Sequence, residues 1–460
     1  MDISFSNGRS GSGPATWGQQ AIWDVVNRLT PADRPRYNIT TASPVDPGVP
    51  VQTTLDALRD LLHLHDSLHT RLHPDESGTG LRQTVDPDGL LTVHTRHCDD
   101  DPTELATAGS ALHRRLAADP FDSATDWPLR VGLVIADGLV RHITLVLSHT
   151  AVDGSGMGRV IQDLTELALG ATPESVRAER SPQQPLEEAE FQRSERGRRR
   201  DANARAHVLR KLRLGPPRLF PPTTAESAPF PNALLDSPAL FRAVDLVATA
   251  HRASSSSVLL AAACTMTAEL SGSPDVVIQV IVSNRFLPGL TDAVSVIASD
   301  GMFHLPNAAG DFGETVRRTQ AAAIATYRHA YYERRLLDGE IDRLTAEGVP
   351  LADRSCIFND TRDLLPATLA TAPVPSSEPL DRARERTTLT WPTEFDPRPG
   401  LSYALDALQT GDALQLAMTA DPAVLPRPAM ARFLLGIENL VVGEAEALAG
   451  AAEAVAVPAG

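Results

Sequence analysis

A histidine followed four residues later by an Asp-Gly pair is the part of this sequence best suited to chemistry. His149, Asp153 and Gly154 lie within residues 145–164, LVLSHTAVDGSGMGRVIQDL. Histidine ordinarily titrates near neutrality, so a histidine that is held rigidly and faces a cleft is suited to general-base catalysis. We expect Asp153 to fix the turn by accepting backbone or arginine hydrogen bonds. We expect Gly154 to allow a close backbone approach.

The flanking residues predict the elements that would hold this histidine. An apolar run at 143–147 predicts a buried strand, and Asp137-Gly138 before it indicates a two-residue hairpin. After the Asp-Gly pair, apolar residues recur on one helical face at Met157, Val160, Ile161 and Leu164. The sequence therefore predicts a strand, a turn carrying His149, and a helix.

Residues 148–154, SHTAVDG, resemble the HHxxxDG motif of nonribosomal peptide synthetase condensation domains. Relatives of those domains include chloramphenicol acetyltransferase and plant acyltransferases with an HxxxDG motif. In that superfamily the second histidine acts on the nucleophile of an acyl transfer and the aspartate is structural. The resemblance assigns these roles to His149 and Asp153, whereas Ser148 replaces the first histidine. Ser148 becomes a candidate for substrate contact or oxyanion stabilisation.

Two alternatives to catalysis at this motif stay open. HxxxDG is short, and a lone histidine beside apolar residues also fits a core or turn histidine. A metal site is not expected, because no third ligand follows His149 and Asp153. A second group of histidines at near-helical spacing is expected on a solvated face: His63, His65, His69 and His73.

Other segments resemble family motifs in the same order along the chain. Thr16, Gln19 and Trp23 follow the spacing of S-x-A-Q-x-R-L-W. Residues 64–72 resemble R-H-E-x-L-R-T-R-F and end a helix predicted over residues 51–72. The family places there an arginine that pairs with the motif aspartate. That partner is left open here among three residues, His69, Arg71 and Arg130.

The second half of the chain contributes candidates for the wall of a substrate tunnel. Residues 276–282 predict a buried strand that runs into Ser283-Asn-Arg-Phe286. Residues 294–298 then resemble the family segment V-G-x-F-x-N. The candidate tunnel residues that follow are Ser299, Asp300 and His304.

The resemblance implies an α/β fold of two chloramphenicol-acetyltransferase-like lobes in a V-shaped pseudo-dimer with a central tunnel. We predict an N-terminal lobe at 1–175 carrying the motif, a helical and Pro-rich linker at 176–232, and a C-terminal lobe at 233–460. The basic stretch 193–213 fits a solvated helix face; the alternative is a docking surface for an acidic carrier protein.

Composition limits the classes of partner. The chain has 460 residues, 42% hydrophobic and 22% charged, with a net charge of −16, which argues against nucleic acid. No apolar run approaches a membrane span and the N-terminus has no leader pattern, so no membrane association is expected. Cys98, Cys264 and Cys356 are widely spaced and predict free thiols, which favours the cytoplasm.

The function implied by the resemblance is a condensation-type acyltransferase of natural-product biosynthesis. It would join an acyl or aminoacyl thioester on an acyl or peptidyl carrier protein to an amine or hydroxyl acceptor, forming an amide or an ester. The substrate would arrive on a phosphopantetheine arm, with no cofactor bound by the enzyme itself. Thioester attack needs no covalent enzyme intermediate.

Two other functions fit the same fold. One is an acyltransferase that uses coenzyme A thioesters. The other is a catalytically silent condensation-like domain that binds a carrier protein or recruits a partner enzyme. No adenylation signature or carrier-protein serine motif is visible, so we expect a free-standing enzyme or an excised domain.

Overall fold

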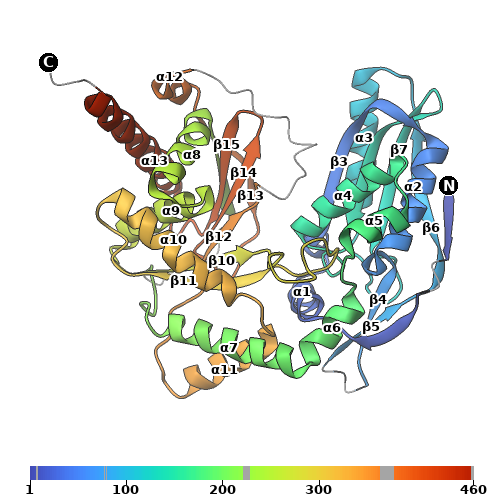
Figure 1. Cartoon of the computed structure of the whole chain (residues 1–460), viewed down its shortest axis with the longest axis horizontal. Helices are drawn as coiled ribbons and strands as arrows, with labels where there is room; N and C mark the ends of the chain where they lie inside the picture. The colour runs from blue at the N-terminus through green and yellow to red at the C-terminus, as the bar shows by residue number, and fades with distance from the viewer. Residues whose placement is uncertain (7–8, 77, 79, 221–227, 363–377, 457–460) are drawn as a thin grey trace. The chain divides into compact units, whose positions relative to one another are not determined.

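The computed structural model describes residues 1–6, 9–76, 78, 80–220, 228–362 and 378–456 (Figure 1). It contains two compact units. The first comprises Met1–Arg200, Ser283–Ala298 and Glu333–Arg335, and the second comprises Asp201–Val282, Ser299–Tyr332 and Leu336–Gly460. Residues 176–200 and 283–298 thus fold with the first unit, across the predicted lobe boundaries. Part of the predicted linker, 221–227, lies outside the described residues.

The first unit is built on two sheets. A five-stranded sheet has the order β1-β6-β7-β8-β3 and a three-stranded sheet has the order β2-β5-β4. Only β6 and β7 pair in parallel within the first sheet, as far as the described strands show. The strands are β1 (Asp2–Ser6), β2 (Gly11–Pro14), β3 (Ile39–Pro50), β4 (Thr70–Pro74), β5 (Leu81–Val85), β6 (Asp88–His97), β7 (Leu129–Ala136) and β8 (Leu139–Leu147).

Helices α2 (Val51–Leu64) and α4 (Gly154–Ala168) pack on one face of this unit's main sheet, and α3 (Pro102–Ala117) packs on the other. The remaining helices of this part of the chain are α1 (Trp17–Arg28), η1 (Arg34–Tyr37), η2 (Asp66–His69), α5 (Pro173–Arg180), α6 (Pro185–Arg193) and α7 (Glu195–Leu212). The boundary between the two units falls inside α7.

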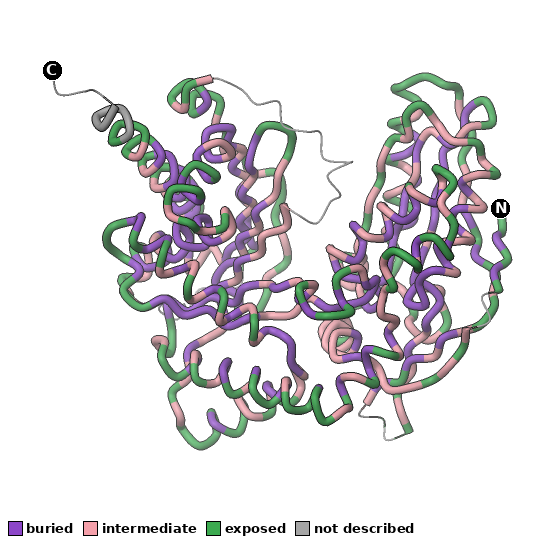
Figure 2. The backbone as a smooth tube through the Cα atoms, viewed as in Figure 1, coloured by how far each residue is buried: buried purple, intermediate pink, exposed green. Residues whose placement is uncertain are grey.

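Strand β8 is buried on both faces, which explains its continuous apolar run. Leu145 and Leu147 pack into a core with residues of α2 and α4, whereas Val146 packs on the opposite face against α3. Successive strand residues point to opposite faces, so a strand covered on both sides needs apolar residues throughout. Figure 2 shows buried residues along the strands of this unit.

The predicted hairpin between β7 and β8 is confirmed, with Asp137 and Gly138 at φ 50° and 78°.

The helix predicted over residues 51–72 is wrong beyond Leu64. His65 is extended (φ −124°, ψ 106°), a short 3-10 turn follows, and Thr70–Pro74 forms β4. The His65 ring is buried, and its Nε2 lies 2.7 Å from Oδ2 of Asp163 on α4. This side-chain pairing and the pairing of β4 with β5 replace the continued helix.

The second unit is built on a seven-stranded sheet with the order β11-β10-β12-β14-β15-β9-β13. Its strands are β9 (Phe230–Ser237), β10 (Val276–Val282), β11 (Ser299–Leu305), β12 (Cys356–Asp360), β13 (Thr388–Phe395), β14 (Tyr403–Thr410) and β15 (Ala413–Ala420). Its helices are α8 (Pro238–His251), α9 (Ser255–Ser271), α10 (Phe312–Arg328), α11 (Arg334–Ala346), α12 (Leu380–Glu385) and α13 (Arg427–Ala456); the first residues of α11 belong to the first unit.

Helix α9 shows how sequence determines an element of the second unit. Its residues from Val258 to Cys264 are all buried, and alanine is common among them because close packing favours small side chains. Ser254 caps the N-terminus by accepting from Ser257 N, and Gly272 ends the helix at φ 71°. Within the described part of the chain, no helix combines the length and apolar character needed to cross a bilayer.

Candidate active site

His149 follows the last residue of β8 and is held by a backbone carbonyl. Its Nδ1 lies 2.9 Å from the oxygen of Val152. A carbonyl oxygen only accepts hydrogen bonds, so in the neutral ring Nδ1 carries the hydrogen and Nε2 keeps the lone pair. The ring is half-buried, and its centroid lies 6.3 Å from that of Tyr37. The side chain is therefore oriented as a proton acceptor at Nε2.

Asp153 anchors the turn that follows His149. It is the N-cap of α4, and its Oδ1 accepts from Gly156 N at 2.8 Å. Its Oδ2 accepts from two further backbone amides, Ile297 N at 2.9 Å and Ala298 N at 2.8 Å. The carboxylate thus binds the start of α4 to residues 283–298 of the same unit.

The ion-pair partner of Asp153 is Arg285. Its Nη2 lies 2.7 Å from Oδ1 and its Nη1 lies 3.0 Å from Oδ2, a two-point contact. Arg285 belongs to Ser283-Asn-Arg-Phe286, the turn that follows β10, which was not among the predicted partners of Asp153. Burial by itself would raise the pKa of Asp153, but Arg285 and the backbone donors together lower it below its ordinary value.

The three partners predicted from the sequence are wrong, because each is engaged elsewhere. His69 Nδ1 lies 2.7 Å from the oxygen of Asp86, and Arg71 pairs with the Asp86 carboxylate at 3.0 Å. His69 ends η2 just before β4, Arg71 lies in β4, and Asp86 follows β5. Arg130 donates to carbonyl oxygens of Leu116, Asp119 and Pro120.

The close approach expected at Gly154 is seen at Gly156, where the backbone lies against Val152. A Cβ added there would lie 2.5 Å from Cγ2 of Val152, closer than real Cβ contacts. Gly154 is the first residue of α4. The catalytic assignment of His149, Asp153 and Gly154 stays a prediction at this point.

Residues 283–298 are secured to the first unit at further points. Ser295 is buried and donates to Oε2 of Glu188 at 3.0 Å, while Arg159 of α4 contacts Asp292 at 2.9 Å. The Gly18 position in α1 is also in close contact, since a Cβ there would lie 1.9 Å from the Val296 oxygen.

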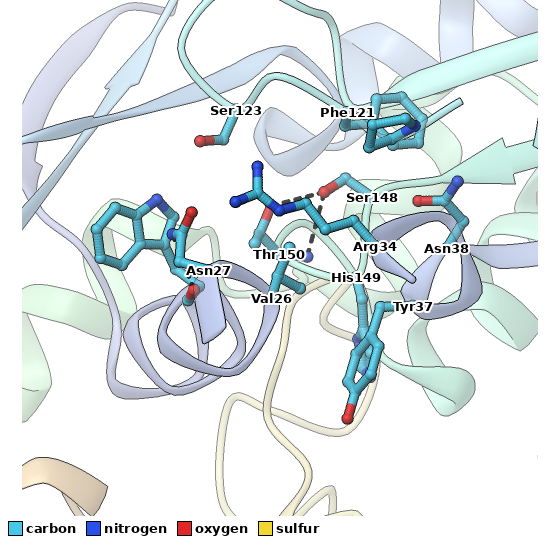
Figure 3. Close-up of a pocket in the computed structure, with 12 residues that line it drawn as sticks. Val26, Asn27, Arg34, Tyr37, Asn38, Phe121, Ser123, Ser148, His149 and Thr150 are labelled. Carbon is cyan, nitrogen blue, oxygen red and sulfur yellow. Dashed lines mark hydrogen bonds between the residues drawn. The ribbon is translucent and has the colours of Figure 1, made fainter. Parts of the chain in front are cut away.

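A small pocket adjoins His149 (Figure 3). Its volume is about 50 Å³, and it is lined by Trp23, Val26, Asn27, Arg34, Tyr37, Asn38, Pro120, Phe121, Ser123, Ser148, His149 and Thr150. The Ser148 hydroxyl lies 2.8 Å from that of Thr150. In Figure 3 the His149 ring lies beside Tyr37, away from the Ser148 hydroxyl and the Arg34 guanidinium. Successive residues at a strand end point in opposite directions, so Ser148 and His149 serve different sides of the turn.

The remaining candidates lie in the second unit. Ser299, Asp300 and His304 all belong to β11; His304 is buried, and the first two are half-buried. The Asp300 carbonyl accepts from the Tyr332 hydroxyl at 2.9 Å. Their place in a tunnel wall stays a prediction. Over the described residues, no group of three His, Cys, Asp or Glu side chains is arranged to hold a metal ion.

Two curated proteins resemble this chain in sequence. The isonitrile lipopeptide synthase of Mycobacterium tuberculosis is 27% identical over 343 residues, which cover 69% of this chain. CymA of Salinispora arenicola, a probable non-canonical nonribosomal peptide synthetase, is 28% identical over 152 residues, 33% of this chain. The chain spans only 13% and 2% of the lengths of these relatives.

Solved structures resemble it across nearly its whole length. The condensation domain that mediates chain release from the enacyloxin polyketide synthase has a TM-score of 0.70 at 18% identity, covering 94% of this chain and 82% of that one. SgcC5 from Streptomyces globisporus, in complex with a naphthyl-ethanediol and sucrose, has a TM-score of 0.68 at 18% identity, with coverages of 94% and 99%.

The starter condensation domain of rhizomide synthetase, in complex with C8-CoA, has a TM-score of 0.67 at 17% identity, with 95% coverage of both chains. These likenesses confirm the predicted α/β fold of two chloramphenicol-acetyltransferase-like lobes. The V-shaped arrangement and its tunnel stay predictions. The condensation-domain family model matches residues 14–372, and the chain therefore belongs to the condensation-domain family.

Proposed function

We propose that this protein is a condensation-type acyltransferase of natural-product biosynthesis. It would join an acyl or aminoacyl thioester, presented on the phosphopantetheine arm of a carrier protein, to an amine or hydroxyl acceptor. The observation that carries the proposal is the contact between Nδ1 of His149 and the Val152 carbonyl. That contact leaves Nε2 as the proton acceptor, which is the state that a general base requires.

In this proposal His149 acts on the acceptor. Nε2 takes the proton from the amine or hydroxyl as its nitrogen or oxygen attacks the thioester carbonyl. A C–N or C–O bond forms and the C–S bond breaks. The sulfur leaves with the electron pair and recovers the proton. Asp153 does not touch the reacting atoms in this scheme; it holds the turn on which Val152 and His149 lie.

The known proteins support the reaction class. A chain-release condensation domain, a starter condensation domain bound to C8-CoA and a lipopeptide synthase are among the relatives. The C8-CoA complex also favours a second candidate, an acyltransferase that takes coenzyme A thioesters directly. The presence of Ser148 in place of the first motif histidine favours a third, a silent domain that binds a carrier protein or recruits an enzyme.

Product formation tests the proposal directly. A panel of acyl-loaded carrier proteins would be mixed with small amines and alcohols, and products would be measured by mass spectrometry. We compare native protein with His149→Ala and with His73→Ala, a control histidine on β4. General-base catalysis contributes about 10²- to 10⁴-fold, so His149→Ala should lose that much rate while His73→Ala keeps it.

The other outcomes separate the candidates. Equal product from native protein and His149→Ala would contradict the role of this histidine. Product from coenzyme A thioesters alone would establish the second candidate. No product from either thioester, with carrier binding retained, would favour the silent domain. Circular dichroism of each variant would confirm that the fold is intact.

A further inference from the structure

The pocket beside His149 contains a positive charge without a negative counterpart. Of its twelve lining residues one is an arginine, Arg34, and none is an aspartate or glutamate. The chain as a whole carries 58 acidic against 42 basic residues, and arginines such as Arg9 and Arg285 pair with acidic side chains.

Arg34 lacks side-chain partners within the described part of the chain. Its Nε is buried and makes no hydrogen bond, and its guanidinium forms no ion pair with the described carboxylates. Figure 3 shows the guanidinium turned into the space near Ser123, Ser148 and Thr150. The residue as a whole is half-buried and only its Nε is shut off from solvent, so an anionic acceptor in this space would supply the hydrogen bond that Nε lacks.

We propose that this pocket binds a carboxylate group, with Arg34 as the charged donor and the Ser148 hydroxyl beside it. A guanidinium presents two parallel N–H groups that match the two oxygens of a carboxylate. The size agrees, because a water needs roughly 10–15 Å³ of such space and the pocket offers about 50 Å³. That space holds the three heavy atoms of a carboxylate with little to spare.

The replaced motif residue explains why the pocket is open. Ser148 occupies the position of the first histidine in HHxxxDG, and its side chain lines the pocket. A histidine here would place an imidazole ring in a space of about 50 Å³. The serine instead leaves both the volume and a hydroxyl donor next to Arg34.

The identity of the occupant rests on the proposed acyl transfer. His149 is among the lining residues, although its ring is turned toward Tyr37. We therefore place the carboxylate on the acceptor, which would extend from Arg34 around the turn to bring its amine or hydroxyl to Nε2 of His149. The acceptor class is therefore an amino acid or hydroxy acid with a free carboxylate, rather than a simple amine or alcohol.

Binding is tested first, without reference to activity. Native protein is titrated with acetate, acetamide and inorganic phosphate by ligand-observed NMR. We expect acetate to bind and acetamide, its neutral counterpart, not to bind. Arg34→Gln should weaken acetate binding about ten- to hundredfold, as expected for losing a charged hydrogen-bond donor. Arg36→Gln, which alters an exposed arginine two residues away that pairs with Asp33, should leave it unchanged.

Three results would overturn the pocket assignment. They are acetate binding that survives Arg34→Gln, phosphate binding that is tighter than acetate and depends on Arg34, and acetate binding that survives Ser148→His. The last substitution restores the family histidine and should fill the pocket.

The acceptor assignment is tested with matched pairs, each an amino acid and its amide, in the condensation assay. Native protein should prefer the carboxylate form in kcat/KM by at least about tenfold, and Arg34→Gln should remove that preference. A preference unchanged in Arg34→Gln would refute the acceptor role even where acetate binds. No product from any acceptor would refute the proposed acyl transfer, while the acetate titration would still decide whether the pocket binds carboxylates.

Discussion

Removing the Arg285 guanidinium is expected to destabilise the first unit strongly. The Asp153 side chain is 2% exposed and that of Arg285 is 13% exposed, so Arg285→Met leaves a buried carboxylate without its counter-charge. Breaking a buried pair costs about 3–5 kcal/mol. The backbone amides of Gly156, Ile297 and Ala298 still hydrogen-bond the carboxylate, which favours the lower value of about 3 kcal/mol.

Thermal denaturation followed by circular dichroism measures this loss. A cost of about 3 kcal/mol corresponds to a midpoint lowered by about 6–12 °C for a unit of this size. Arg71→Met is the comparison, because Arg71 and Asp86 are each 27% exposed; the loss of such a pair costs about 1 kcal/mol or less. Asp153→Asn combined with Arg285→Met should cost less than the sum of the single changes, since no buried charge is left unpaired.

The loss of stability in Arg285→Met should depend on pH. In native protein the folded pKa of Asp153 is below 3.8, so its contribution is present above 3.8 and is lost as pH falls toward the folded pKa. In Arg285→Met, burial should raise the pKa of Asp153, so protonation should relieve the variant at a higher pH. The midpoint difference between native and variant protein should therefore shrink as pH falls. Equal midpoints for Arg285→Met and native protein, or strictly additive losses in the double variant, would refute this account.

Two further predictions concern His65, which follows α2, and Gly18 in α1. Burial lowers the pKa of His65, although its bond to Asp163 opposes that, so the unfolded chain takes up a proton below pH 6.5 that the native state does not. This proton uptake lowers the free energy of unfolding by about 1.4 kcal/mol per pH unit. Because glutamine cannot titrate, His65→Gln should lose less stability below pH 6.5, as measured by urea denaturation. Gly18→Ala would drive a methyl group into the Val296 carbonyl and should lower the denaturation midpoint by a cost of about 1–3 kcal/mol. Gly443→Ala, in a helix with open space around that position, should instead raise the midpoint; a rise for Gly18→Ala too would contradict the contact.

Local signals in the sequence predicted the strand, turn and helix around His149. The hairpin residues, the buried run and the helical periodicity all act within about twenty residues, and β8 and α4 form as expected. The same signals failed at His65. Leucine periodicity continues to Leu68, but the helix ends at Leu64 because His65 pairs with Asp163, 98 residues away.

The partner of Asp153 was outside the reach of such reasoning for the same reason. Arg285 lies 132 residues from Asp153, and nothing in the sequence distinguishes it from other arginines as the one that reaches the carboxylate. Residues 283–298 fold with the first unit although the strands on both sides of them belong to the second. Only the fold shows that these residues join the first unit, so the predicted partners were His69, Arg71 and Arg130 instead of Arg285.

The spacing of the motif has a physical explanation in this geometry. Three residues between His149 and Asp153 allow the chain to turn, so that the Val152 carbonyl returns to Nδ1 of His149 while Asp153 caps α4. The carbonyl that sets the tautomer of His149 therefore belongs to the residue next to the one that Arg285 holds. A shift of Asp153 would move Val152 with it, and Nδ1 would lose the acceptor that keeps the lone pair on Nε2. In this arrangement Arg285 is a positioning residue that acts on the proposed base through Asp153 and one peptide unit, which gives the motif aspartate a structural role in the proposed mechanism.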